Sequence, residues 1–189
     1  MALILASASP RRRELLSLIT KDFTVETSRV DEAAITAPTP AKLAQALADA
    51  KCRAVAARHP EDIVIGCDTV VDYAGRVFGK PKDHEDALRM LRALSGAQHH
   101  VHTGVCIAFP GGEERFTVTT KVKFYPIEEA QLEAYAATGE PYDKAGAYAI
   151  QGRAGLFIER IEGPYHNVVG LPLYTLGRIF NRLFDGLLS

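Results

Sequence analysis

The sequence predicts a mixed α/β fold, of the α+β kind, in a single domain over residues 1–189. Short apolar runs with strand character alternate with stretches in which apolar residues recur at helical spacing, and this alternation is typical of that class. The chain is 189 residues long, which is enough for one well-packed core and short for two. No repeat, low-complexity stretch or flexible linker divides it.

The first quarter of the chain predicts two strands and two helices. Leu3–Ala6 is a short apolar strand. Ser9 followed by Pro10 is a typical helix start, because proline at the first helical position loses only an N–H that has no helical acceptor. Phe23–Thr27 alternates at period two and predicts a second strand. After a polar loop, Thr39-Pro40 opens a helix whose expected apolar face is Leu43, Leu47, Ala50 and Ala54.

The middle of the chain begins with its most apolar strand. Ile63–Cys67 is expected to be a buried central strand that ends at Asp68-Thr69. Two shorter strands, Val70–Tyr73 and Arg76–Phe78, flank a turn at Ala74-Gly75. Asp83 is the expected N-cap of the next helix, which ends at Ser95-Gly96 and has an apolar face of Leu88, Leu91 and Leu94.

The last half predicts a long hairpin, a helix, an irregular strand region and a final helix. His99–Phe109 and Arg115–Phe124 are long strands joined by a turn at residues 110–112. A helix is expected to start near Ile127 and to end by Gly139. Glycine-punctuated strand structure is expected from Lys144 to Ile161. The final helix covers Leu173–Leu183, and its apolar face is Leu176, Ile179, Phe180 and Leu183.

The composition excludes several functional classes. The formal net charge is −1, so we expect no basic face for nucleic acid. Residues 6–8 imitate a signal-peptidase site, but the apolar run before them is too short and the arginines follow it. No apolar stretch reaches membrane-spanning length. Cys52, Cys67 and Cys106 lack metal-site spacing and are expected to be buried thiols, so the sequence predicts a cytoplasmic protein with no membrane partner.

The segment from Ser7 to Arg13 is the most informative part of the chain. Between the first strand and the first helix, it brings together free backbone N–H groups, the hydroxyls of Ser7 and Ser9, and up to three guanidinium groups. A helix N-terminus favours anions, and arginine binds phosphate oxygens in a bidentate manner. The segment therefore predicts a phosphate site; the alternative on this turn alone is an ordinary helix start with solvated arginines.

Further polar residues could complete a site for an anionic substrate. Asp68 follows a buried strand, where a carboxylate can hold a divalent cation or accept a proton from water, although taken alone this position favours a turn cap. Lys51 falls on the inward stripe of its helix and needs an anionic partner there, unless it extends to the surface. Lys80 and Lys82 could neutralise phosphate charge or form an ordinary basic loop; the loop lacks P-loop spacing.

The segment from Asp143 to Gly152 mixes polar groups with small residues, which allow a ligand or a backbone to approach closely. The amide of Gln151 has a donor and an acceptor that match O4 and N3–H of a uracil or thymine ring. The glycines could instead form turns. His100 and His102 share a strand face, but without a third ligand at suitable spacing no zinc site is expected.

Taken together, these segments resemble the Maf family of nucleoside triphosphate pyrophosphatases. The matching segments run in family order over almost the whole chain: Leu5–Arg12, Asp31-Glu32, Ala50-Lys51, Gly66–Thr69, Gly79–Pro81, Asp143–Tyr148, Gln151-Gly152 and Val169–Pro172. The resemblance implies a fold related to the inosine triphosphate pyrophosphatases, with a central mixed sheet, flanking helices and a cleft between two lobes. It also implies hydrolysis of a nucleoside triphosphate to the monophosphate and pyrophosphate, a divalent cation (Mg²⁺ or Mn²⁺) and a homodimer.

The resemblance also assigns roles to the candidate residues. Asp68 becomes the proton acceptor and, together with Glu32, a carboxylate on the metal side. The phosphate contacts become Ser7, Arg11, Arg12, Lys51, Lys80 and Lys82. The family's branches differ at the positions of Arg11, Thr69 and Gln151, and this trio resembles the branch that hydrolyses dTTP and UTP.

Two other functions fit parts of the same pattern. A non-catalytic nucleotide-binding regulator of cell division or septum formation would keep Arg11 and the lysines but would not need Asp68 and Glu32 together. A pyrophosphatase for a different base, such as that of inosine or xanthosine triphosphate, would fit the fold but not Gln151 as a reader of pyrimidines. Because both carboxylates are present, the sequence favours an enzyme with a nucleotide house-cleaning role.

Overall fold

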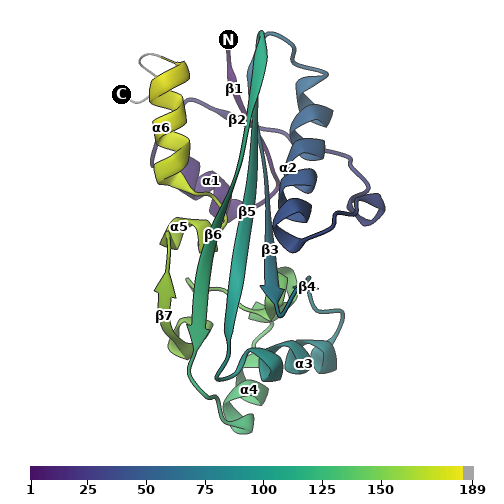
Figure 1. Ribbon diagram of the computed structural model, residues 1–189, viewed down its shortest axis with the longest axis vertical. Coiled ribbons are helices and arrows are strands. Elements are labelled where there is room, and N and C mark those ends of the chain that lie inside the picture. Colours follow the sequence, from purple (N-terminus) through teal and green to yellow (C-terminus); the bar gives the residue numbers. More distant parts are fainter. Residues whose placement is uncertain (185–189) are drawn as a thin grey trace.

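The computed structural model describes residues 1–184 and contains, within them, a seven-stranded mixed sheet flanked by helices (Figure 1). The strand order is β2-β1-β3-β5-β6-β7, and β4 pairs with β3 beside that path. β1 (Leu3–Ala6) is parallel to β2 (Thr24–Val25) and to β3 (Ile63–Tyr73), whereas the other pairs are antiparallel. The predicted mixed α/β class with a central mixed sheet is confirmed.

The remaining strands are β4 (Arg76–Phe78), β5 (Gln98–Phe109), β6 (Gly112–Phe124) and β7 (Ile158–Glu162). The helices are α1 (Pro10–Leu16), α2 (Pro40–Ala56), α3 (His84–Leu94), α4 (Glu129–Ala136), α5 (Tyr165–Val169) and α6 (Leu173–Leu183). Short 3₁₀ turns cover Glu32–Ala34, Glu140–Asp143, Ala145–Ala147 and Arg153–Phe157. No helix within residues 1–184 is both long enough and apolar enough to cross a membrane.

The long strands β3, β5 and β6 run through the whole molecule and connect two lobes (Figure 1). In the first lobe, successive residues of β1 point to opposite faces of the sheet. Leu3 and Leu5 pack with the core that contains α1 and α6, whereas Ile4 and Ala6 pack against α2. In the second lobe, a separate core forms around α3, α4 and the 3₁₀ turns and includes Phe124. The sheet is therefore shared, but each lobe has its own apolar packing.

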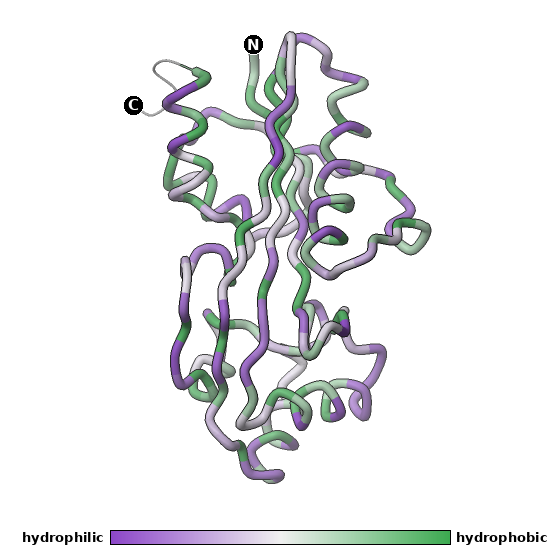
Figure 2. Tube along the Cα trace, viewed as in Figure 1, coloured by the Kyte–Doolittle hydropathy of each residue, from purple (hydrophilic) through white to green (hydrophobic). Residues whose placement is uncertain are grey.

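Helix α2 lies very close to the sheet because glycines face it at two points. A Cβ atom on Gly66 would lie 2.4 Å from the carbonyl oxygen of Ala48, and one on Gly104 would lie 2.4 Å from that of Ala44. The buried residues of α2 are Ala44, Leu47, Ala48, Cys52 and Val55. Of the expected stripe, Leu47 is buried as predicted, but Leu43, Ala50 and Ala54 are only partly buried, because small side chains on a neighbouring face meet the glycines. Hydrophilic and hydrophobic residues alternate along the helix accordingly (Figure 2).

Strand β3 is longer than the sequence predicts. It runs from Ile63 to Tyr73 without a break, so Asp68 lies in the middle of a strand and not at its end. The β-branched residues 69–71 continue the extended backbone. The turn is where it was expected, at Ala74-Gly75, and both residues have positive φ angles, of 52° and 77°.

Other predicted boundaries also need correction. The region from Lys144 to Ile161 consists of two 3₁₀ turns joined by irregular backbone, and only its last part belongs to strand β7. Gly146 and Ala147, with φ angles of 71° and 61°, interrupt any strand there. The second strand shrinks to two exposed residues, and the helix after Ile127 covers only Glu129–Ala136. The N-caps predicted at Thr39 and Asp83 are confirmed, since each side chain accepts a hydrogen bond from a backbone N–H three residues later.

Candidate active site

A cleft of about 420 Å³ lies between the lobes at one edge of β3. Strand β5 occupies the other edge from Val64 to Asp72. On the cleft side, β1 pairs with β3 only as far as Gly66, and β4 joins only from Val71. Residues 67–70 of β3 therefore have no strand partner there among the described residues. Asp68 lies two residues beyond the carboxyl end of β1, which is where open α/β sheets bind ligands.

The centre of the cleft holds two carboxylates joined by one ammonium group. The Nζ atom of Lys51 lies 2.6 Å from Oδ1 of Asp68 and 2.9 Å from Oε1 of Glu32. The side chains of Lys51 and Asp68 are each only 12% exposed, whereas that of Glu32 is 54% exposed. The inward-pointing lysine thus has the anionic partners that its burial requires. Its place on α2, which lies flat on the sheet over Gly66, brings its amine to Asp68.

Arg12 joins three segments of the chain beside this centre. Its Nε donates to the carbonyl oxygen of Gly170 at 2.9 Å, Nη1 donates to Oγ of Ser7 at 3.2 Å, and Nη2 donates to Oγ1 of Thr69 at 3.0 Å. Thr69 bonds in turn to Thr103, whose hydroxyl donates to a backbone carbonyl of α5. Three of the five guanidinium N–H groups are engaged in this way, so Arg12 fixes the geometry of the cleft and keeps two donors for a ligand.

The turn before α1 has the predicted form with one difference. Ser9 is the N-cap residue and Pro10 occupies the first turn, but the Ser9 side chain makes no capping bond. Instead its backbone N–H donates to Oγ of Ser7 at 3.3 Å. Ser7 is 7% exposed and accepts bonds from both sides, so its hydroxyl is fixed at the wall of the cleft.

Other cationic side chains surround the cleft. Arg11 and Lys80 line it, and Arg11 forms an ion pair of 3.6 Å with Asp143 on the opposite lobe. Lys144, which the sequence did not single out, also lines the cleft, with a side chain that is only 14% exposed. The signal for it was available, since it belongs to the Asp143–Tyr148 segment. Lys82 is exposed and does not line the cleft, so its phosphate contact stays a prediction.

The three positions expected to set substrate choice all line the same cleft. Arg11 comes from α1, Thr69 from β3 and Gln151 from the 3₁₀ region of the second lobe. Gln151 is exposed, and no hydrogen bond holds its side-chain amide among the described residues. The structure thus brings these three residues together, although each is more than 50 positions from the next along the sequence.

The two carboxylates form a fitting partial site for a hard divalent cation. Within residues 1–184, no group of three or more His, Cys, Asp or Glu side chains could hold a metal ion by itself. Asp68 uses Oδ1 for Lys51, and its Oδ2 has no hydrogen-bond partner among the described residues. Mg²⁺ is commonly held by one or two carboxylates plus the phosphates of a substrate. Asp68 and Glu32 offer that donor set.

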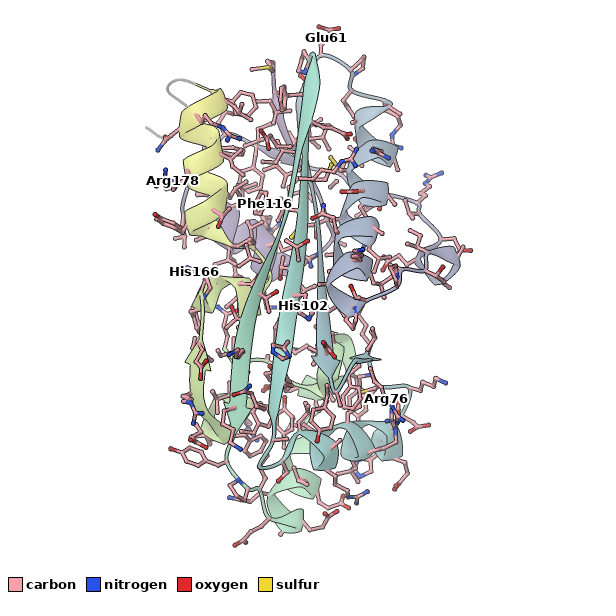
Figure 3. All side chains as sticks on the ribbon, in the orientation of Figure 1. Glu61, Arg76, His102, Phe116, His166 and Arg178 are labelled. Atoms are coloured by element: carbon pink, nitrogen blue, oxygen red, sulfur yellow. The ribbon has the colours of Figure 1, made fainter. Side chains whose placement is uncertain are left out.

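The cysteines and histidines lie outside this chemistry. Burial raises the pKa of the Cys67 thiol to about 11, and Sγ donates to the carbonyl oxygen of Gly170. This thiol is therefore protonated and serves in packing, as expected. His102, labelled on β5 in Figure 3, bonds to Asp72 and Thr119 and stacks on His100, with ring centroids 5.9 Å apart.

Comparison with known proteins places this geometry in a family. A dTTP/UTP pyrophosphatase of Geobacillus sp. (strain WCH70) is 52% identical over 181 residues, which cover 96% of this chain and 97% of that protein. Proteins of the same name from Moorella thermoacetica and Thermococcus gammatolerans are 53% and 50% identical, and the matches cover 90% and 94% of this chain and 89% and 94% of those proteins.

Solved structures support the fold. The Ham1 protein of Staphylococcus aureus has a TM-score of 0.55 at 16% identity, and a HAM1 protein of Coxiella burnetii has 0.52 at 13%; each comparison covers 95% of this chain and 98% of the other. The expected fold of the inosine triphosphate pyrophosphatase type is confirmed at the level of architecture. Residues 2–183 match the family described as Maf-like protein, and the chain belongs to the Maf family.

Proposed function

We propose that this protein is a nucleoside triphosphate pyrophosphatase that hydrolyses dTTP and UTP to the monophosphate and pyrophosphate, in a nucleotide house-cleaning role. The observation that carries the proposal is the buried Asp68 carboxylate, bonded to Lys51 in a cleft lined by cations. The substrates come from the names of relatives about half identical to this chain over nearly its full length.

The cationic side chains are suited to bind the triphosphate. Arg11, Arg12 and Lys80 line the cleft, Arg12 keeps two unengaged donors, and the hydroxyl of Ser7 is fixed beside Arg12. Phosphoryl-group reactions ask for little covalent chemistry from the protein, so that positioning and neutralisation of charge account for most of the acceleration. Arg11 must exchange its exposed ion pair with Asp143 for a phosphate oxygen.

We assign the proton transfer to Asp68. A water oxygen attacks the α-phosphorus, the bond from that phosphorus to the bridging oxygen of the β-phosphate breaks, and pyrophosphate leaves with the bond electrons. The proton of the attacking water passes to the Asp68 carboxylate and from there to solvent. Lys51 holds Oδ1 through its hydrogen bond, so Oδ2 is the oxygen left for the water.

We also propose a divalent cation, Mg²⁺ or Mn²⁺, held by Asp68 and Glu32 together with substrate phosphates. When bound, it would withdraw charge from the phosphate oxygens. Both carboxylates contact the Lys51 ammonium, so they lie close enough together to be shared by one cation. Removal of divalent cations with a chelator is expected to abolish turnover, and added Mg²⁺ or Mn²⁺ to restore it.

The base preference is assigned to Arg11, Thr69 and Gln151. The amide of Gln151 can donate to O4 and accept from N3–H of thymine or uracil, whereas cytosine presents the reverse pattern. Where a bound base covers this amide, a mismatched base leaves polar groups unpaired, at about 1–3 kcal/mol each. We therefore expect kcat/KM for dTTP and UTP to exceed that for CTP by at least about tenfold.

A nucleotide panel tests the function. Purified protein with Mg²⁺ is assayed against dTTP, UTP, CTP and GTP, and both products are identified. Equal amounts of monophosphate and pyrophosphate from dTTP and UTP are expected. Orthophosphate and a diphosphate as primary products would mean attack at the γ-phosphorus and would refute the reaction. CTP or GTP as the best substrate would refute the assigned branch but not the reaction.

We further propose a cytoplasmic homodimer. Three buried free thiols suit a reducing compartment. Large apolar side chains such as Leu156 and Tyr174, 84% and 71% exposed, offer surfaces that a second copy could cover. Light scattering on purified protein is expected to give twice the mass of one chain.

A further inference from the structure

The direction of the Gln151 side chain depends on the backbone that carries it. The side chain is exposed, and its amide has no hydrogen-bond partner among the described residues. A side chain that is to distinguish two base edges must nevertheless point to one place. The following residue, Gly152, donates its N–H to the carbonyl oxygen of Ala149 at 3.1 Å and packs directly on the carboxylate of Glu140.

Glu140 contacts the loop that carries Gln151 and Gly152, and both of its carboxylate oxygens accept hydrogen bonds. The hydroxyl of Tyr135 donates to Oε1 at 3.0 Å, and the backbone N–H of Arg153 donates to Oε2 at 3.1 Å. Tyr135 is 3% exposed and belongs to the core of the second lobe. Burial, followed by the charge of Glu140, raises the pKa of Tyr135, so its hydroxyl keeps its proton and acts as the donor.

The contact with Gly152 is as close as a glycine permits. A Cβ atom at that position would lie 2.0 Å from Oε1 of Glu140 and 2.8 Å from Oε2. Only glycine therefore allows the carboxylate to lie against the backbone immediately after Gln151. The hydrogen bonds from Tyr135 and Arg153 to Glu140 connect the packed core to this loop. The loop carries the amide of Gln151, to which the proposed function assigns base recognition.

We propose that Glu140 is a positioning residue for base selectivity, which fixes the backbone on either side of residue 152 so that Gln151 points at the base edge. This inference rests on the proposed function, since it assigns the selection of that same site. Glu140 itself is not among the residues that line the cleft. Its loss is expected to reduce discrimination between bases and to leave the chemical step at Asp68 in place.

Three variants separate the contacts of Glu140 with the loop from the negative charge of its carboxylate. Glu140→Ala removes both acceptors. Glu140→Gln keeps an oxygen for the Arg153 N–H, and its NH₂ can donate to the Tyr135 hydroxyl, which then acts as acceptor. Gly152→Ala leaves Glu140 present but pushes its carboxylate away from the loop. Glu129→Ala is the matched control, because Glu129 is a carboxylate of the same lobe that pairs with Arg92 at the surface.

The experiment measures kcat and KM of each variant for dTTP, UTP, CTP and GTP, and the hydrogen exchange of the backbone N–H of Arg153. Glu140→Ala and Gly152→Ala are expected to reduce the ratio of kcat/KM between the best and the worst nucleotide from at least about tenfold to below about threefold. The loss should appear in KM for the best nucleotide, with kcat changed less than about twofold. The Arg153 N–H should exchange faster in both variants, and Glu140→Gln and Glu129→Ala should behave like the parent protein.

Several outcomes would overturn the proposal. An unchanged ratio in Glu140→Ala would do so, and so would an equal loss of kcat on every nucleotide, which indicates a general structural role. If Glu140→Ala does not fold, Gly152→Ala and the rescue by Glu140→Gln decide. The ratio of kcat/KM is taken between the nucleotides that are best and worst for the parent protein. A parent protein that prefers another base would therefore refute the proposed substrate. The ratio would still decide the role of Glu140.

Discussion

At the scale of single residues, Lys51 and Asp68 neutralise each other's charge, and one oxygen of Asp68 stays free of this contact. Each side chain has lost most of its water, and a buried charge without a partner is strongly destabilising. Oδ1 of Asp68 satisfies the lysine, while Oδ2 stays available in the cleft. Glu32 gives the lysine a second, more exposed partner.

Replacing Asp68 by asparagine is expected to lower kcat for dTTP by about 10²–10⁴ while KM stays within about threefold. The amide keeps the shape and can still accept a bond from Lys51, but it cannot take the proton of water. Steady-state kinetics and nucleotide binding by calorimetry measure the two effects. Asp72→Asn is the control, since Asp72 lies on the same strand and bonds to His102; near-normal turnover in Asp68→Asn would remove this carboxylate from the mechanism.

At the scale of elements, the close packing of α2 on the sheet positions the Lys51 amine beside Asp68. Because the contacts at Gly66 and Gly104 are with backbone atoms of α2, the helix cannot make room by changing a rotamer. An added methyl group must lift the helix. The same movement would draw Lys51 away from Asp68, so the packing of this helix and the proposed active site are linked.

Gly66→Ala is therefore expected to lower both the free energy of unfolding, by about 1–3 kcal/mol, and kcat. Denaturant unfolding and steady-state kinetics measure the two changes. Gly177→Ala in α6 is the matched control, because a Cβ there meets nothing within 4 Å. That variant should gain about 0.5–1 kcal/mol from the better helix former and keep full activity. A stable and active Gly66→Ala would show that α2 is less tightly held than its contacts indicate.

A second link between elements depends on pH. Glu26, just after β2, is bonded by Arg58 and His59 beyond the end of α2. These two hydrogen bonds, that of Arg58 first, hold the pKa of Glu26 below its usual value of 4.5. A carboxyl group with a lowered pKa in the folded state adds stability above its unfolded pKa and loses it as the pH falls through the folded value.

We expect Glu26→Gln to have a lower Tm than the parent protein at pH 7, with the difference shrinking as the pH falls below about 4.5. Thermal unfolding at several pH values, followed by circular dichroism, measures it. Glu61→Gln is the control: Figure 3 shows Glu61 at the tip before β3, and no ion pair holds it among the described residues. A difference that stays constant down to pH 3 would exclude the ion pair as its cause.

The elements that the sequence predicts well are those whose signal is local. The caps at Thr39 and Asp83 and the turn at Ala74-Gly75 are confirmed because each depends on a few neighbouring residues. The rotation of α2 was missed because it is set by glycines on two other strands. The strand expected after Lys144 was missed because positive φ angles at Gly146 and Ala147 are decided by their tertiary surroundings.

At the scale of the whole molecule, the sequence identifies most of the candidate residues that line the cleft, but it does not show which of them contact one another. The motifs supplied Asp68, Lys51 and Gln151, which all line one cleft. They did not show that Arg12 donates three hydrogen bonds to other parts of the chain. They also did not show that Asp68 lies within a strand, just beyond the end of β1. Such facts depend on which strands neighbour each other, and a single sequence does not contain that order.

The single domain over residues 1–189 stays a prediction, and the shared sheet gives it a test. The lobes have separate cores, but β3, β5 and β6 contribute to both. We expect one cooperative transition in which the calorimetric and van't Hoff enthalpies agree. Gly66→Ala, in the first lobe, should shift that whole transition to lower temperature. Two resolved transitions, of which only one moves, would mean that the lobes unfold independently.

The uninterrupted strands also limit how this protein can respond to a nucleotide. Domain closure in other enzymes bends a few loop residues between rigid bodies. Here the long strands β3, β5 and β6 pass between the lobes as paired β-structure (Figure 1). β5 and β6 are bonded from Gln98 to Phe109, and a bend would break that ladder. We therefore expect a nucleotide to be accommodated by side-chain rotamers and short loops around the cleft, with little change in the arrangement of the lobes.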